Sequence, residues 1–228
     1  MTDTPLRLVI FDVDGTLVDS QVFIVEAMHL ACRKADVGLL AKEEILSIVG
    51  LSLPEAMAVL FPQHALSFQT RMVELYKQSF LERRQSTGGE AAAPLYPGAL
   101  ETLRTLDSQG YLLSIATGKA RRGLDHMLDS HGLRTLFLGT QTADDAPSKP
   151  SPQMVLNCMA ATGALPGETV VVGDTEFDLQ MARAAGCHAI GVTWGYHPIE
   201  RLIRAAPRQM IDDFADLIPA IEAIWETA

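Results

Sequence analysis

Two short acidic clusters carry the residue types of a site that binds a divalent cation. Asp12 and Asp14 follow the apolar run Leu6–Phe11, and a second cluster, Asp174–Asp178, follows the apolar run Thr169–Val172. Carboxylates this close repel one another unless a cation neutralises them or one keeps its proton. Each cluster also has an ordinary explanation, the first as a turn and the second as a helix start. Together, at the ends of two expected strands, they favour a shared oxygen-rich pocket suited to Mg²⁺.

Two further fragments have the chemistry of an anion site. Thr117-Gly118-Lys119 follows the run Tyr111–Ala116 and offers a hydroxyl and backbone N–H groups at an expected helix start. Lys149 lies in Pro147–Pro152, a loop whose prolines would hold one ammonium group in place. Taken singly, the threonine could be a helix cap and the lysine a solvated loop residue. Their order along the chain favours an anion site beside the cation site.

The elements that must position these residues alternate between strand and helix. Apolar runs typical of buried parallel strands occupy Leu6–Phe11, Tyr111–Ala116, Thr169–Val172 and His188–Val192. Helical patterns occupy the intervals or flank them: Ala99–Leu106, Arg121–Leu128, Gln153–Ala160 and Leu179–Ala185. This alternation predicts βαβ units around a parallel sheet, in which ligands bind at the carboxyl ends of the strands.

One long segment breaks the alternation. Between about residues 20 and 85 the sequence has only helical patterns, such as Val22–Lys34 and Phe68–Arg84, and residues 86–94 form a linker of small residues, Gly and Pro. We therefore predict an α/β fold, with a Rossmann-like parallel sheet core and an inserted α-helical cap. The predicted core comprises residues 1–18 and 88–228, and the predicted cap comprises residues 19–87.

The net charge and the cysteine content indicate which partners and which cellular compartment to expect. The 228 residues include 18 Lys and Arg against 28 Asp and Glu, a net charge of −10, which argues against a nucleic-acid surface. A small phosphorylated ligand needs only one or two cations and remains compatible. The three cysteines are scattered in sequence, which predicts no disulfide framework and favours a reducing cytoplasm. No apolar stretch approaches the roughly 20 residues of a membrane span.

Four motifs in order make the sequence resemble the haloacid dehalogenase (HAD) superfamily. They are Asp12-Val13-Asp14-Gly15-Thr16, then Thr117, then Lys149, then Gly173-Asp174-Thr175-Glu176-Phe177-Asp178. The resemblance covers essentially the whole chain, including a helical cap inserted after the first motif. It is greatest with the phosphoglycolate phosphatase-like branch, to which Thr193-Trp194-Gly195-Tyr196 is also similar.

The resemblance implies a role for each matched position. Asp12 would be the nucleophile, and Asp14 would be the general acid and then the general base. Mg²⁺ would be held by the Asp12 carboxylate, the Asp14 backbone carbonyl and Asp174, with Asp178 nearby or acting through water. The residues that would bind the substrate phosphate are Thr117, Gly118 and Lys149.

The implied activity is Mg²⁺-dependent hydrolysis of a small phosphorylated metabolite, similar to phosphoglycolate, through an aspartyl-phosphate. Dehalogenases and phosphonatases of the superfamily lack the second aspartate, which is present here as Asp14. β-Phosphoglucomutases have a similar layout, but they carry a cap histidine where Ile24 aligns and basic residues where Val49 and Leu53 align. A phosphosugar mutase is the alternative enzyme, and a non-catalytic binding protein is the alternative of another class. His197 could lie at the rim of the site.

Overall fold

A parallel sheet of six strands forms the centre of the molecule. The computed structural model describes residues 6–86 and 93–226, and within them the strand order is β3-β2-β1-β4-β5-β6, with every pair parallel. The strands are β1 (Leu8–Phe11), β2 (Leu112–Ala116), β3 (Gly139–Gln141), β4 (Thr169–Gly173), β5 (His188–Val192) and β6 (Gln209–Ile211). The predicted α/β class with a Rossmann-like parallel sheet is confirmed.

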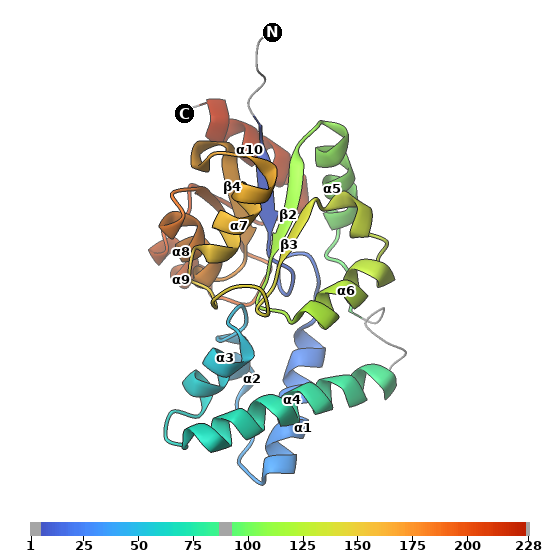
Figure 1. Ribbon diagram of the computed structural model, residues 1–228, viewed down its shortest axis with the longest axis vertical. Coiled ribbons are helices and arrows are strands. Elements are labelled where there is room, and N and C mark those ends of the chain that lie inside the picture. The colour runs from blue at the N-terminus through green and yellow to red at the C-terminus, as the bar shows by residue number, and fades with distance from the viewer. Residues whose placement is uncertain (1–5, 87–92, 227–228) are drawn as a thin grey trace.

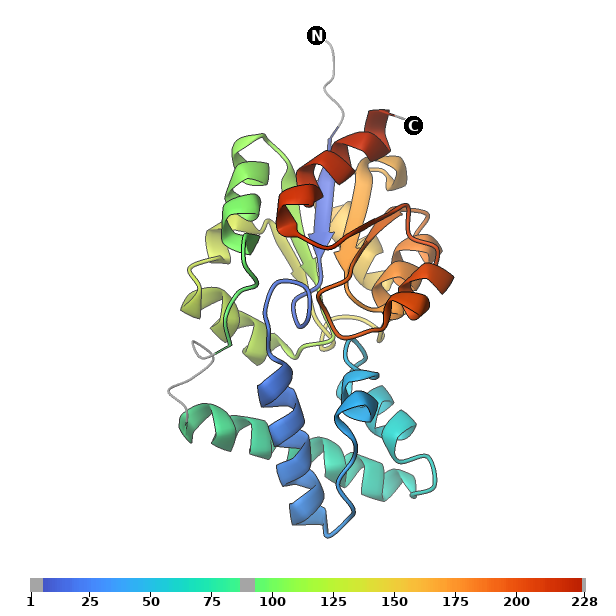
Figure 2. The same ribbon diagram turned by 180° about the vertical axis from the view of Figure 1, so that it is seen from behind.

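Helices cover both faces of the sheet, which explains why the central strands are apolar at most positions. Val9 and Phe11 of β1 face a cluster that includes α5 (Ala99–Ser108), α6 (Arg121–Ser130) and α10 (Leu217–Glu226). The alternate residues Leu8 and Ile10 face a second cluster. That cluster is formed with α7 (Gln153–Thr162), α8 (Glu176–Ala184) and α9 (Ile199–Arg204). Figures 1 and 2 show the two helical layers from opposite sides.

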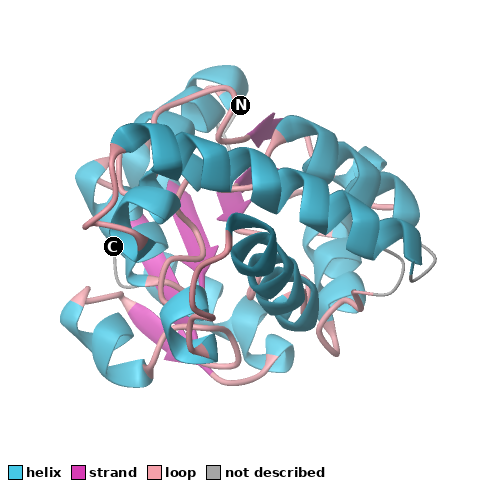
Figure 3. Ribbon diagram, turned by 90° about the horizontal axis from the view of Figure 1, so that it is seen from below, coloured by secondary structure: helices cyan, strands magenta, loops and turns pink. Residues whose placement is uncertain are grey.

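Four more helices lie beyond the carboxyl ends of the strands. They are α1 (Gln21–Ala35), α2 (Lys42–Leu46), α3 (Leu53–Leu60) and α4 (Leu66–Ser86), and we call them the cap helices. They share a separate apolar cluster in which α1 packs along α4. Figure 1 shows them below the sheet, and Figure 3 shows them in front of it when the molecule is seen from below.

The domain boundaries, 1–18 with 88–228 and 19–87, stay a prediction. Most of the predicted linker, residues 87–92, lies outside the described part of the chain, as do residues 1–5. None of the helices in the described ranges is both long and apolar enough to cross a membrane.

The sequence patterns missed several short elements. Strands β3 and β6 have the sequences GTQ and QMI, too short and too polar to stand out as apolar runs. Both lie at the edges of the sheet, where a strand has a neighbour on one side only. Helix α8 begins three residues earlier than the apolar pattern suggested, because its first turn is acidic.

Candidate active site

A buried lysine joins the two acidic clusters. The Asp12 backbone N–H donates to the Val172 carbonyl at 3.0 Å, which continues the β1–β4 ladder and places the Asp12 carboxylate beside the loop after β4. The Lys149 ammonium donates to Asp12 Oδ1 at 2.7 Å and to Asp178 Oδ1 at 2.6 Å. The Lys149 and Asp178 side chains are 0% exposed and that of Asp12 is 2% exposed. These ion pairs are therefore shielded from water, which would otherwise weaken them.

Three carboxylates meet at this point. Asp12, Asp174 and Asp178 each offer an oxygen, and these atoms lie within 4.8 Å of one another. Burial raises the pKa of Asp12 to about 6, against the opposing effect of Lys149. Burial also raises the pKa of Asp174 well above its usual range, and the neighbouring Asp12 and Asp178 raise it further. One ammonium among three carboxylates leaves an excess of buried negative charge.

The donor set fits a divalent cation. Asp12 Oδ2 is buried and has no hydrogen-bond partner within the described residues, although buried carboxylate oxygens normally find one. A cation at this oxygen would satisfy it and would offset the repulsion in the cluster. Carboxylate oxygens are hard ligands of the kind that Mg²⁺ prefers. The Asp14 carboxylate is not part of the cluster; its predicted contribution is the backbone carbonyl.

The loop after β1 packs directly on Asp174. Thr16 Oγ1 donates to Asp174 Oδ1 at 2.9 Å, and the Tyr196 backbone N–H donates to Oδ2 at 2.8 Å. Gly15 has a φ of 92°, and a Cβ at this position would lie 2.2 Å from Asp174 Oδ2. Glycine is therefore required both by the backbone conformation and by the close approach of the carboxylate.

Asp178 serves the helix and the site together. Thr175 is the N-cap of α8, and its backbone N–H and hydroxyl donate to Asp178 Oδ2 at 3.1 and 2.6 Å. Asp178 Oδ1 accepts the bond from Lys149. The capping interpretation is confirmed, and it is compatible with the predicted site because the cap uses one oxygen and Lys149 the other.

Asp14 lies apart from the cluster of three carboxylates and forms an ion pair with Lys119. Ser20 Oγ donates to Asp14 Oδ1 at 2.6 Å, and the Lys119 ammonium lies 3.0 Å from the same oxygen. The Lys119 ammonium also lies 5.6 Å from the centre of the Phe80 ring, on α4. No role was predicted for Lys119, although its place directly after Gly118 in the expected anion-binding fragment was an available signal.

The predicted residues divide between a cavity and the region behind it. A cavity of about 480 Å³ separates the sheet from the cap helices, and Asp12, Asp14, Thr117 and Gly118 all line it. Lys149, Asp174 and Asp178 do not line it; they are buried and grouped with Asp12. Asp12 therefore belongs both to the lining of the cavity and to the buried carboxylate cluster.

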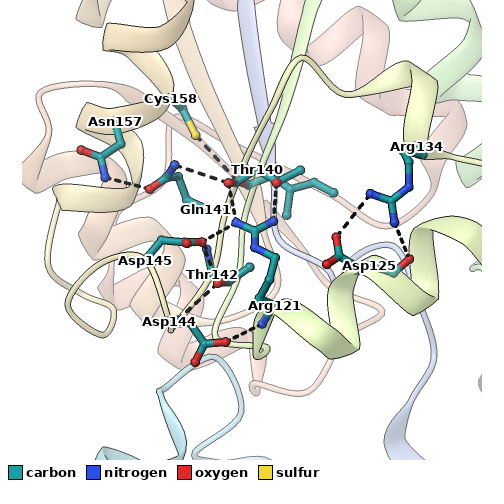
Figure 4. Close-up of polar contacts among 11 residues, drawn as sticks. Arg121, Asp125, Arg134, Thr140, Gln141, Thr142, Asp144, Asp145, Asn157 and Cys158 are labelled. Atoms are coloured by element: carbon teal, nitrogen blue, oxygen red, sulfur yellow. Dashed lines mark hydrogen bonds and ion pairs between the residues drawn. The ribbon is translucent and has the colours of Figure 1, made fainter.

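The helix predicted from Arg121 begins at that residue, but Thr117 lies four positions before it and is not its cap. Helix α6 begins at Arg121, after Ala120 as its N-cap, and Thr117 Oγ1 instead accepts a bond from the Lys119 backbone N–H at 3.3 Å. Figure 4 shows what holds the helix start. The Arg121 backbone N–H donates to Asp144 Oδ2 at 2.7 Å, while the Arg121 guanidinium pairs with Asp145. These contacts join the loop after β2 to the loop after β3.

His197 lies outside the cavity, at a contact between the sheet domain and the cap helices. The Glu176 N–H donates to His197 Nδ1 at 3.2 Å, so the neutral ring carries its proton on Nε2, which donates to the Ser47 carbonyl at 3.0 Å. Burial, and next the nearby Arg201, lower the pKa of His197 to about 4. His197 is therefore a buried packing residue, and the lesser alternative of a rim role has no support, since His197 does not line the cavity.

Comparisons with known proteins agree with this geometry. Residues 9–192 match the family model of the haloacid dehalogenase-like hydrolases. The chain is 37% identical over 222 residues to a probable phosphatase, IndB, of Dickeya dadantii, covering 95% of this chain and 94% of that protein. It is 29% identical to a phosphoglycolate phosphatase of Aliivibrio fischeri, covering 95% and 96%. The crystal structure of a hydrolase from Pseudomonas syringae superposes with a TM-score of 0.83 at 27% identity, covering 96% and 99%.

Proposed function

The chain belongs to the haloacid dehalogenase-like hydrolases and is a phosphoric monoester hydrolase, and from this we propose how its residues act on a small phosphorylated metabolite with Mg²⁺. The observation that carries the proposal is Asp12: its Oδ1 is held by Lys149, its Oδ2 has no partner within the described residues, and it lines the cavity. A carboxylate that Lys149 and the proposed cation hold in place at the cavity is preorganised for attack on a phosphate.

Two displacements at phosphorus complete the reaction. In the first, an Asp12 oxygen forms a bond to phosphorus, the bond from phosphorus to the ester oxygen breaks, and Asp14 gives that oxygen a proton. In the second, water attacks the aspartyl-phosphate, Asp14 takes the proton from the water, and inorganic phosphate leaves with Asp12 restored. Ser20 and Lys119 both hold Asp14 Oδ1, so we assign the proton transfer to Oδ2.

The metal ligands proposed are the carboxylates of Asp12, Asp174 and Asp178 and the backbone carbonyl of Asp14. Mg²⁺ bound there would reduce the repulsion between an anionic nucleophile and an anionic phosphate. Asp178 would contribute directly or through a bound water, since its Oδ1 also accepts the bond from Lys149. The excess of buried carboxylates is what supports this assignment.

Thr117, Gly118 and Lys149 are the proposed phosphate-binding groups. Thr117 and Gly118 line the cavity beside Asp12, and they offer a hydroxyl and a backbone N–H. Lys149 is buried and does not line the cavity, and through its pair with Asp12 it would add charge stabilisation as the phosphoryl group transfers. The proposed cap, residues 19–87, would exclude water during the transfer.

A substitution of the nucleophile tests the proposal. Asp12→Asn keeps the shape of the side chain and removes its charge, so release of inorganic phosphate with Mg²⁺ should fall by at least about 10³-fold. Asp107→Asn, on the exposed face of α5, is the matched control and should keep full activity. 2-Phosphoglycolate serves as the reference ester because several relatives bear its name. Comparable activity in Asp12→Asn would rule out nucleophilic catalysis by this residue.

The alternative mutase would return the phosphoryl group to a bound sugar. Ile24, Val49 and Leu53, the positions where mutases carry histidine or basic residues, all line the cavity and are apolar. A phosphosugar would lack polar partners there, which supports hydrolysis. Incubation with a hexose 1-phosphate separates the two activities, since a mutase forms the 6-phosphate whereas a phosphatase releases phosphate.

We place this activity in a reducing, cytoplasmic compartment with no nucleic-acid partner. The support is chemical: the cysteines Cys32, Cys158 and Cys187 are free thiols, and the net charge is −10.

A further inference from the structure

The cavity also bears on the substrate, and this inference rests on the proposed phosphatase function. We infer that the substrate is a phosphate monoester whose leaving group is a bulky apolar body, aliphatic or aromatic. The cavity of about 480 Å³ falls in the range of about 300–1,000 Å³ that holds drug-sized ligands. A leaving group as short as that of phosphoglycolate would fill little of this space.

The part of the cavity wall beside Gly118 is unsuited to a carboxylate. The loop between α2 and α3 lies directly on the proposed phosphate-binding turn. A Cβ at Gly118 would lie 2.5 Å from the Gly50 carbonyl oxygen and 2.8 Å from that of Leu51. Carbonyl oxygens carry partial negative charge and repel an anion, whereas they tolerate a C–H group. These carbonyls lie on the Cβ side of Gly118, whereas its N–H is the group proposed for the phosphate, so a second anionic group on the Cβ side would be disfavoured.

The side chains that surround this point are apolar. The cap helices and the loop between them contribute Val49, Leu51 and Leu53 near the turn, and Tyr76, Phe80 and Leu81 from α4. Burial of apolar surface against such side chains is favourable in proportion to the area covered. Aromatic rings at two of these positions also suit a flat leaving group.

Within the described residues, four basic side chains line the cavity, Lys77, Arg84, Lys119 and Arg122, and the two lysines are paired with acids. Lys119 is paired with Asp14, and Lys77 is paired with Glu74 on the exposed face of α4. Arg122 is exposed at the start of α6. A carboxylate held close to the phosphate would have to compete with Asp14 for Lys119, at a cost to the proposed proton transfer.

A series of esters tests the inference. The kcat/KM for phosphate release with Mg²⁺ should rise from ethyl to butyl to hexyl phosphate, by about fourfold for each methylene that becomes buried. Phenyl phosphate should rank with hexyl phosphate, and 2-phosphoglycolate should rank below both. A flat series, or a lead for 2-phosphoglycolate, would overturn the inference while leaving the phosphatase function intact. No release from any ester, including 4-nitrophenyl phosphate, would overturn both.

Paired variants locate the effect in the cavity. Leu51 and Leu81 line the cavity, are partly exposed and belong to none of the three packed clusters, so Leu51→Ala and Leu81→Ala should fold normally. Each should lower kcat/KM for hexyl phosphate by about threefold to tenfold and leave ethyl phosphate unchanged. Val59→Ala, on exposed α3 surface outside the cavity, is the control and should change neither. Equal losses on both esters would place the leaving group elsewhere and overturn the assignment.

Discussion

Replacing Lys149 with methionine should expose how far one ammonium stabilises the buried acidic cluster. Methionine keeps most of the length of the side chain and removes its charge. In the native protein the ammonium pairs with Asp12 and Asp178, and all three side chains are at most 2% exposed. Lys149→Met leaves these two carboxylates and Asp174 with no buried cation among them in the metal-free protein.

The expected loss is large and depends on pH. Removing one partner of a buried ion pair costs about 3–5 kcal/mol of unfolding free energy. The pKa of Asp12 is already raised to about 6 by burial, and loss of Lys149 must raise it further. A carboxyl whose pKa is raised by folding binds protons more tightly in the native state. The pH-dependent part of this loss is about 1.4 kcal/mol for each further pKa unit. It is fully present above the new pKa and disappears below about pH 6.

Urea denaturation of the metal-free protein measures this loss. The unfolding free energy of Lys149→Met, relative to the native chain, should fall by about 3–5 kcal/mol near pH 8 and by clearly less near pH 5. Lys34→Met is the matched control: its pair with Glu82 is exposed, so it should lose under about 1 kcal/mol at either pH. Equal losses in the two variants, or a Lys149→Met loss that ignores pH, would refute the reasoning from buried charge.

Two further predictions follow from the same region. Mg²⁺ should stabilise the native chain against unfolding by about 2.7 kcal/mol at 100 times its dissociation constant, and it should stabilise Asp174→Asn much less. Calorimetric melting of both proteins with and without Mg²⁺ measures this. Equal stabilisation of the two would exclude Asp174 as a ligand. His197 is buried neutral with its pKa lowered to about 4, so the stability it contributes is full above about pH 6.5 and is lost toward pH 4, by about 3 kcal/mol. Urea midpoints of the native chain and His197→Gln should therefore converge on acidification, and parallel pH curves would contradict the effect.

The sheet and its acidic ends could be predicted because they follow from local patterns. Strands buried on both faces must be apolar at most positions, so β1 and β4 stood out in the sequence. In a parallel sheet their carboxyl ends lie at one edge, and Asp12 and Asp174 therefore had to be neighbours. The short edge strands β3 and β6 lack such a pattern, since few of their residues are buried.

The partners within the site could not be predicted, because they join distant parts of the chain. Lys149 reaches Asp12 across 137 positions, and Lys119 reaches Asp14 across 105. The motifs predicted Asp12, Asp14 and Lys149 as site residues, but they predicted neither these pairs nor a role for Lys119. The apolar cavity wall was likewise hidden, because an apolar residue on a helix can face either the core of the cap helices or the cavity.

Asp178 shows why local structure and site chemistry need not be competing explanations. Its place three residues after Thr175 is typical of a capping box, which alone accounts for an acidic residue there. The cap fixes one carboxylate oxygen on the Thr175 N–H and hydroxyl, and this orientation aims the other oxygen at Lys149. The helix start therefore positions the buried lysine that holds the proposed nucleophile. A substitution that keeps the cap and removes the charge, such as Asp178→Asn, would leave α8 in place and still weaken the hold on Lys149.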